Sequence, residues 1–166
     1  MSAFSLRDAT PSDVPDVFRL TRGLADNERE LDRFTATEAD FHRILFEPGP
    51  RAFAILAEIP GHRPVGIALF YHTINTFMAT TALFLEDLFV EPPHRGTGIG
   101  LGLMRAVAAR AVADRCGWME WRVLNWNQPA IDFYDRLGAR PIEKWHVRQL
   151  HDEALTALAQ GDSKHG

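Results

Sequence analysis

Cysteine is almost absent from this sequence. Cys116 is the single cysteine among 166 residues, so no disulfide can form within the chain. A lone thiol fits a reducing compartment better than an oxidising one. The first residues, Met-Ser-Ala-Phe-Ser-Leu-Arg, also lack the apolar core of a signal peptide. We therefore expect a cytoplasmic protein.

An excess of positive charge is missing as well. The chain carries 18 Lys and Arg against 22 Asp and Glu, which gives a formal net charge of -4, and it contains no basic run. Proteins that bind the phosphate backbone of nucleic acids need a basic surface. We therefore expect no nucleic-acid partner.

Two kinds of catalytic motif are not found. The 7 histidines show no metal-ligand spacing, and there is no His-Glu-x-x-His sequence. No serine or cysteine lies in a Gly-x-Ser-x-Gly context, which would expose a nucleophile at a sharp turn. We expect neither a metal site nor a covalent acyl-enzyme.

Long uncharged runs are rare, and only Pro64–Leu85 approaches the ~20 residues that a membrane helix needs. The centre of this segment, Tyr71–Thr76, is polar and β-branched. That composition favours a hairpin of two buried strands over a membrane span, because a span would leave polar groups in lipid. We expect no membrane contact.

What is present is a series of strand and helix patterns with no repeat and no linker. We expect a single α/β (α+β) domain over 1–160, followed by a disordered tail at 161–166. Apolar spacing predicts strands at 4–7, 51–58, 64–74, 83–90, 118–124 and once or twice within 140–150, and helices at 11–25, 37–46, 101–116 and 127–137 with a short terminal helix at 152–159.

The most informative stretch is Leu83–Gly102. A strand pattern is stopped by two prolines and followed by Arg-Gly-Thr-Gly-Ile-Gly at 95–100, directly before an alanine-rich helix pattern. Such a turn exposes backbone N–H groups to a phosphate. The glycines fit neither a nucleotide P-loop nor a dinucleotide fingerprint, since the Lys and the third glycine that these motifs require are missing. The pattern that fits is Arg-x-x-Gly-x-Gly, at Arg95, Gly98 and Gly100, and its alternative is an ordinary turn before a helix.

This loop resembles the acyl-CoA pyrophosphate loop of the GNAT superfamily of N-acetyltransferases, and the element order agrees with that family over almost the whole chain. The segments 6–13, 85–90, 95–100 and 126–139 include Leu-Glu-Asp-x-Phe-Val and Trp-Asn-x-Pro. They are similar to the branch that acetylates spermidine, spermine, other diamines and thialysine. The resemblance implies the GNAT fold, with a mixed central sheet of about six to seven strands flanked by about four helices in the order β-α-α-β-β-β-α-β-α-β(-β).

By the same resemblance, acetyl-CoA is the cosubstrate and meets three segments of the chain. The backbone of the strand end would pair with pantetheine and polarise the thioester carbonyl. The residues implied are Leu88, Phe89 and Val90 on that strand, Arg95, Gly96, Thr97, Gly98, Ile99, Gly100 and Leu101 in the loop, and Asn127, Pro129, Ala130 and Tyr134 on the following helix.

We expect Tyr134 to be the general acid. Asn127, a residue type that commonly caps helices, begins the helix that carries Tyr134. Seven residues at about 100° each bring the two side chains onto one helix face. A phenol with a reference pKa of ~10 is protonated at neutral pH and can give its proton to a departing thiolate. The alternative is a core aromatic packed with Phe133, and the resemblance favours the acid.

We expect Glu86 to serve the acceptor amine. A carboxylate in an apolar strand is costly to bury unless it has a partner or a task. An amine like that of lysine, with a pKa of ~10.4, must lose a proton before it attacks. Glu86 can hold the ammonium group and take its proton, directly or through water. The neighbouring Asp87 is expected on the opposite face of the strand, in a structural hydrogen bond.

The substrate side is suggested by Glu28 and Asn27. By resemblance, Glu28 is a carboxylate that faces the substrate, although acidic runs of this kind are commonly solvated loops. Asn27 stands where the diamine branch commonly has an aromatic residue, so no cation–π face is available there. This departure counts against a long polyamine and leaves shorter diamines, thialysine-like amino acids and other small amines open, within the expected class of diamine, polyamine or thialysine-like substrates.

The function expected from these residues is acetyl transfer from acetyl-CoA to a primary amine of a small cationic substrate, by direct attack. The alternatives are a protein or peptide N-acetyltransferase and a non-catalytic acyl-CoA-binding domain, and the presence of both Tyr134 and Glu86 favours an enzyme. The resemblance also implies a homodimer that pairs through Trp145–Leu150.

Overall fold

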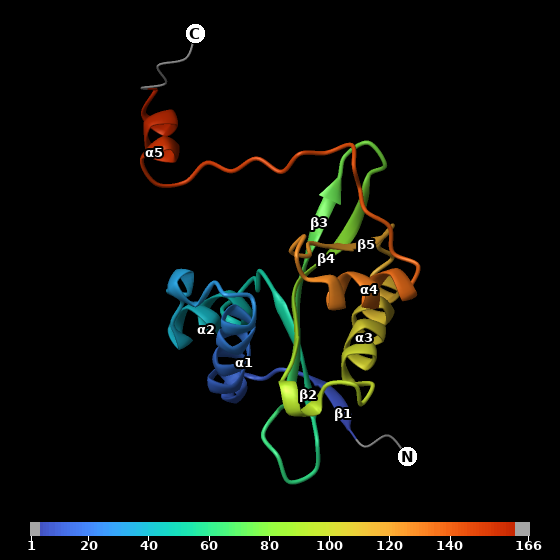
Figure 1. Ribbon diagram of the computed structural model, residues 1–166. Coiled ribbons are helices and arrows are strands. Elements are labelled where there is room, and N and C mark those ends of the chain that lie inside the picture. The colour runs from blue at the N-terminus through green and yellow to red at the C-terminus, as the bar shows by residue number, and fades with distance from the viewer. Residues whose placement is uncertain (1–3, 162–166) are drawn as a thin grey trace. The chain divides into compact units, whose positions relative to one another are not determined.

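The computed structural model describes residues 4–161, and its centre is one five-stranded sheet (Figure 1). The strands lie in the order β1-β2-β3-β4-β5. The first four pair antiparallel, whereas β5 pairs with β4 in parallel, so the sheet is mixed. Their bounds are β1 Ser5–Asp8, β2 Phe53–Glu58, β3 Gly66–Asn75, β4 Thr80–Val90 and β5 Met119–Trp121.

Within residues 4–161 the chain forms five α-helices. They are α1 Val14–Asn27, α2 Glu38–Phe46, α3 Ile99–Ala113, α4 Gln128–Arg136 and α5 Asp152–Gln160, with short 3₁₀ turns at Pro11–Asp13, Leu31–Arg33 and Pro92–His94. The chain divides after Leu124 into two compact units. The first holds the sheet with α1, α2 and α3, and the second holds α4 and α5.

The first unit has three layers. Helices α1 and α2 cover one face of the sheet, and α3 covers the other (Figure 1). On the α1 face, alternate strand residues such as Leu56 and Ile67 join Val17 and Leu20 in one apolar cluster. Because both faces are covered, the middle of β2 and the start of β3 are buried without interruption, which explains their continuous apolar sequence.

Two helix starts are capped by side chains of the same turn. Thr10 and Asp13 form a capping box that leads through a 3₁₀ turn into α1. Thr37 caps α2, where its hydroxyl accepts the Asp40 N–H at 3.3 Å and Asp40 Oδ2 accepts the Thr37 N–H at 3.1 Å. Each box satisfies backbone donors that the first helical turn leaves without a partner.

The segment Pro64–Leu85 forms the predicted hairpin, since β3 and β4 pair from Gly66 to Val90. Across residues 4–161, no helix is both long enough and apolar enough to cross a membrane.

The sheet differs from the prediction at its end. Five strands are found among the described residues, not six to seven, and the element order follows the expected one only as far as α4. The span 140–150 has turn or irregular structure where closing strands were expected. Alternation of side chains predicts a strand only if a partner edge is available, and the sequence pattern does not provide the edge. Of the expected tail at 161–166, residues 162–166 lie outside the described residues, and the single domain over 1–160 stays a prediction.

Candidate active site

The glycine-rich turn between β4 and α3 has a backbone that favours glycine. Gly96 and Gly98 have φ angles of 74° and 89°. A Cβ at either position would meet no atom within 4 Å, so the glycines are needed for their positive φ and not for packing inside the chain. Gly98 is the N-cap of the 15-residue helix α3. The turn is exposed and open at the positive end of a helix, an arrangement that suits a pyrophosphate.

The N–H groups at the start of α3 are the groups through which this loop could contact a phosphate. Ile99 is buried, with 1% of its surface exposed, so only its N–H can face a ligand. Thr97 donates its hydroxyl to the carbonyl of His94 at 2.6 Å, which tightens the turn. The N–H groups of Ile99, Gly100 and Leu101 belong to the first helical turn and have no partner within the helix.

Arg95 links the loop to α1. Its Nε donates to the carbonyl of Val90 at 2.9 Å, and one terminal nitrogen donates to Asn27 Oδ1 at 3.0 Å. The guanidinium also lies over the Phe89 ring, 5.5 Å from its centroid. The structure thus brings Asn27 to the loop, and the substrate contact expected for Asn27 stays a prediction.

The strand β4 leaves one edge open beyond its middle. Its parallel ladder with β5 runs from Leu83 to Leu85 and ends there. From Glu86 to Val90, the edge of β4 that faces β5 therefore has no ladder pairing with β5. The side chains of Phe89 and Val90 are buried, so the role expected for Leu88–Val90 rests on their backbone groups.

A β-bulge in β4 places the two strand carboxylates on one face. In the ladder with β3, Leu69 pairs with Asp87 and Phe70 pairs with Leu85, so Glu86 is an extra residue without an opposite partner. A bulge interrupts the alternation of side chains. Both Glu86 and Asp87 consequently line the same pocket, and the prediction that Asp87 lies on the opposite face in a structural hydrogen bond is wrong.

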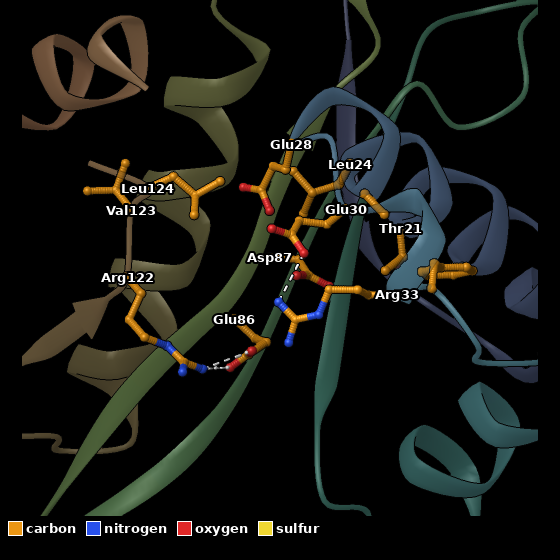
Figure 2. Close-up of a pocket in the computed structure, with 12 residues that line it drawn as sticks. Thr21, Leu24, Glu28, Glu30, Arg33, Glu86, Asp87, Arg122, Val123 and Leu124 are labelled. Atoms are coloured by element: carbon orange, nitrogen blue, oxygen red, sulfur yellow. Dashed lines mark hydrogen bonds and ion pairs between the residues drawn. The ribbon is translucent and has the colours of Figure 1, made fainter. Parts of the chain in front are cut away.

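This pocket has a volume of about 670 Å³ and lies within the first unit (Figure 2). Figure 2 shows four carboxylates, from the end of α1, the following loop and β4, around the same space as two guanidinium groups. The lining residues are Thr21, Leu24, Ala25, Glu28, Glu30, Arg33, Phe34, Glu86, Asp87, Arg122, Val123 and Leu124.

Glu86 is held by polar partners. One terminal nitrogen of Arg122 donates to both Glu86 oxygens, at 3.0 and 3.2 Å. The Tyr71 hydroxyl donates to Glu86 Oε2 at 3.3 Å. Arg122 itself lies over the Phe84 ring, 5.2 Å from the centroid, which fixes its guanidinium beside the strand.

Asp87 differs from Glu86 in its burial and in its partners. Its carboxyl is largely buried, and among residues 4–161 no side chain or backbone group forms a hydrogen bond or ion pair with it. Burial, and then the negative charges of Glu86 and Glu28, raise the pKa of Asp87 to about 7. Burial and the charge of Glu30 likewise raise the pKa of Glu28. The pocket therefore concentrates negative charge that lacks full compensation.

Sequence reasoning located Glu28 and Glu86 but missed several residues of this pocket. Glu30 and Arg33 form an ion pair at 3.0 Å at its rim. Arg122 gave a usable signal, because it is a lone cation within the predicted strand 118–124. Arg33 gave none, since its place depends on the turn after α1. Across the described part of the chain, no group of three or more His, Cys, Asp or Glu side chains could hold a metal ion.

In the second unit, α4 carries Tyr134 as predicted. Asn127 caps this helix and its side-chain oxygen accepts the Ala130 N–H at 3.4 Å, with Pro129 in the first turn. Tyr134 lies beside Phe133, with 5.3 Å between the ring centroids. Seven residues separate Asn127 from Tyr134, so both lie on one side of α4.

Comparison with known proteins adds three results. The model of the "Acetyltransferase (GNAT) family" matches residues 16–139. Thialysine N-epsilon-acetyltransferase of Sus scrofa is 32% identical over 169 residues, which cover 96% of this chain and 99% of that protein. Spermidine/spermine N(1)-acetyltransferase-like protein 1 of Homo sapiens is 32% identical over 168 residues, and this chain spans 24% of its length.

Two further proteins extend the comparison. L-ornithine N5-acetyltransferase of Arabidopsis thaliana is 29% identical over 197 residues, covering 92% of this chain and 86% of that protein. An integron cassette protein of V. cholerae has a solved structure with a TM-score of 0.79 at 23% identity, covering 95% of this chain and 98% of that one. At that identity the structural likeness shows the fold.

Proposed function

The chain belongs to the GNAT family of N-acetyltransferases, and from this premise we propose that it transfers an acetyl group from acetyl-CoA to a primary amine of a small cationic substrate. The observation that carries the proposal is the acidic pocket beside β4. Glu28, Glu30, Glu86 and Asp87 line it against only two guanidinium groups. An ammonium group entering this pocket gains charge-assisted hydrogen bonds in a partly desolvated space.

The donor side is supported by the turn at 95–100 and the open edge of β4. The positive φ angles of Gly96 and Gly98 and the open space around them leave room for phosphate groups. Arg95 places a cation beside the same turn. Bound acetyl-CoA would supply the acyl group as a thioester, and Leu88–Val90 would meet its pantetheine arm through their backbone.

On α4, we propose that Tyr134 protonates the departing thiolate, and that Asn127, Pro129 and Ala130 contact the pantetheine arm. Asn127 and Tyr134 share one side of this helix, which is consistent with contacts to a single extended ligand. The hydroxyl of Tyr134 is the group in this helix that can act as a general acid.

The substrate that we propose is a short diamine or a diamino acid. Glu28 lines the pocket, whereas Asn27 contacts Arg95. Arg33 and Arg122 add guanidinium groups to the lining, and these can bind the carboxylate of an amino acid. The related enzymes named for thialysine and L-ornithine act on amino acids of this kind, which supports the same class here.

A panel of amines assayed for thiol release from acetyl-CoA tests the proposal. We expect turnover with short diamines and diamino acids, and little turnover with monoamines that lack a second charged group. Peptides with free lysines or N-termini serve as the comparison. Turnover with peptides alone would contradict a small-molecule acceptor, and no turnover with any amine would contradict the proposed function.

The variant Glu28→Gln sharpens this test. Loss of one charged hydrogen-bond partner costs about 1.5–3 kcal/mol, so KM for a diamine should rise roughly tenfold or more. Glu47→Gln removes an exposed carboxylate just after α2 and is the matched control for charge. If Glu28→Gln and Glu47→Gln have the same KM for the diamine, Glu28 does not bind the acceptor.

We also propose that the protein is a homodimer that pairs through Trp145–Leu150. Trp145 and Val147 are 68% and 71% exposed, so this segment presents large apolar side chains that a second copy can cover. Sedimentation should give a dimer at micromolar concentration, and Val147→Glu should shift it to monomer. Val112→Glu, at an apolar residue 78% exposed on α3, should leave the dimer intact. A monomeric parent protein would rule out this interface.

A further inference from the structure

Two adjacent carboxylates on β4 line one pocket but have opposite surroundings. Glu86 receives hydrogen bonds from Arg122 and Tyr71. Arg122 and Tyr71 therefore already occupy the carboxylate oxygens of Glu86 and fix their orientation. Glu86 is thus suited to holding a cationic group in place.

Asp87 has no such partners. Among the described residues none donates to its carboxyl, although that carboxyl lines the pocket and is largely buried. Thr21 lines the same pocket, and its Oγ1 is buried and has no hydrogen-bond partner among the described residues. A buried carboxyl without a partner is costly, and its affinity for a proton is correspondingly high.

We propose that Asp87 is the proton acceptor for the substrate ammonium group and that Glu86, paired with Arg122, positions that group. This inference rests on the proposed acetyl transfer and assigns the proton to the second of the two carboxylates. It differs from the expectation that Glu86 performs both tasks.

The step balances as follows. The N–H bond of the ammonium group breaks, the proton goes to an Asp87 oxygen, and the electron pair stays on nitrogen. Nitrogen then forms a bond with the thioester carbonyl carbon, and the carbon–sulfur bond breaks with its electron pair on sulfur. Sulfur takes up one proton, which is balanced by the second proton that nitrogen loses on becoming an amide. Asp87 returns its proton to solvent, so each turnover releases one proton in total.

The charges around Asp87 come from every element that faces the pocket. Glu86 lies on β4, Glu28 follows α1, Glu30 and Arg33 lie in the next turn, and Arg122 follows β5. Both guanidinium groups are paired with other carboxylates, Arg33 with Glu30 and Arg122 with Glu86. Asp87 therefore has no cation paired with it among the described residues. The negative charges of Glu86 and Glu28 raise the pKa of Asp87, in the same direction as burial does.

The test is the pH dependence of kcat/KM for a diamine acceptor in the parent protein and in three variants. In the parent, activity should rise with pH through about 7, because Asp87 must be deprotonated to accept a proton. Asp87→Asn should lower kcat by about 10²-fold and remove this rise. Asp87→Glu, which restores a carboxylate, should recover part of the activity with the rise at a different pH.

Glu86→Gln separates the two roles. It should raise KM but keep the rise in activity, moved to lower pH because one negative charge near Asp87 is gone and Arg122 is released. Glu47→Gln controls for the removal of a distant carboxylate. Carbon-13 NMR of labelled aspartate side chains gives a readout that does not depend on turnover, since one carboxyl should titrate near 7 in the parent and be missing from Asp87→Asn.

The outcomes are distinguishable. If the parent acetylates amines but Asp87→Asn keeps its kcat and pH profile, the assignment of Asp87 is overturned and the proposed function stands. If Glu86→Gln loses the rise with pH, Glu86 is the acceptor. If the parent acetylates no amine, both proposals fall together. Should Asp87→Asn not fold, the pH profile of Asp87→Glu and the NMR titration of the parent still decide the matter, because a parent in which no aspartate titrates near 7 contradicts the assignment.

Discussion

Tyr134→Phe should lower turnover by roughly 10²-fold or more while the protein remains folded. The change removes one hydroxyl and keeps the ring, so the contact with Phe133, whose ring centroid is 5.3 Å away, is preserved. Without a proton donor, the leaving thiolate must depart as an anion, and the barrier to breaking the carbon–sulfur bond rises. Affinity for acetyl-CoA should change little, because a single neutral hydrogen bond is worth only about 0.5–1.5 kcal/mol net.

Steady-state kinetics beside a thermal melt and calorimetry with CoA check this prediction. The expected combination is an unchanged melt, nearly unchanged CoA affinity and a large fall in kcat. If Tyr134 were only a packed aromatic residue, turnover would stay near the parental value. Parental turnover in a folded variant, with chemistry as the slow step, would show that another group supplies the proton.

Gly98→Val should weaken CoA binding by at least about tenfold, which corresponds to a loss of about 1.4 kcal/mol. Gly98 has a φ of 89° and caps α3, and a β-branched residue is strained in that region. The valine either holds the turn in a strained form with its side chain in the open space or shifts the turn to negative φ. Both outcomes disturb the N–H groups that we propose to bind the pyrophosphate.

Gly49→Val is the matched control for this variant. Gly49 has a φ of 77°, and a Cβ there would likewise meet no atom within 4 Å, but it lies in the turn after α2. Both variants should lose a similar amount of thermal stability, and only Gly98→Val should lose affinity for CoA. Calorimetry that finds parental CoA affinity in a folded Gly98→Val variant would remove the loop from the donor site.

The acetyltransferase family and the glycine-rich turn before α3 could be predicted because their signals are local in sequence. Arg95, Gly98 and Gly100 stand at fixed spacing between a strand and a helix, and the φ angle of Gly98 depends on the turn itself. Helix caps such as Thr10 with Asp13 are equally local, since both partners lie within one turn. Local geometry of this kind needs no knowledge of the rest of the chain.

The pocket beside β4 could be predicted only in part. Glu86 was recognisable as a carboxylate in an apolar strand, but the alternation rule placed Asp87 on the wrong face. The bulge arises from the register of β4 against β3, where Leu69 meets Asp87 and Phe70 meets Leu85. Register is a property of two paired strands, so it cannot be predicted from the sequence of either strand alone.

The chain by itself therefore determined the type of β1 to β5 and of the five α-helices among the described residues, the position of the caps and the glycine turn, because these depend on neighbours within a few residues. The tertiary structure alone decided that Arg122 pairs with Glu86, that Asn27 meets Arg95, and that Asp87 is buried without a partner among the described residues. It also decided that 140–150 forms no strand, since a strand needs an edge to pair with. Partners far apart in sequence, burial and charge–charge repulsion exist only after the chain has folded, and the proton affinity of Asp87 depends on all three.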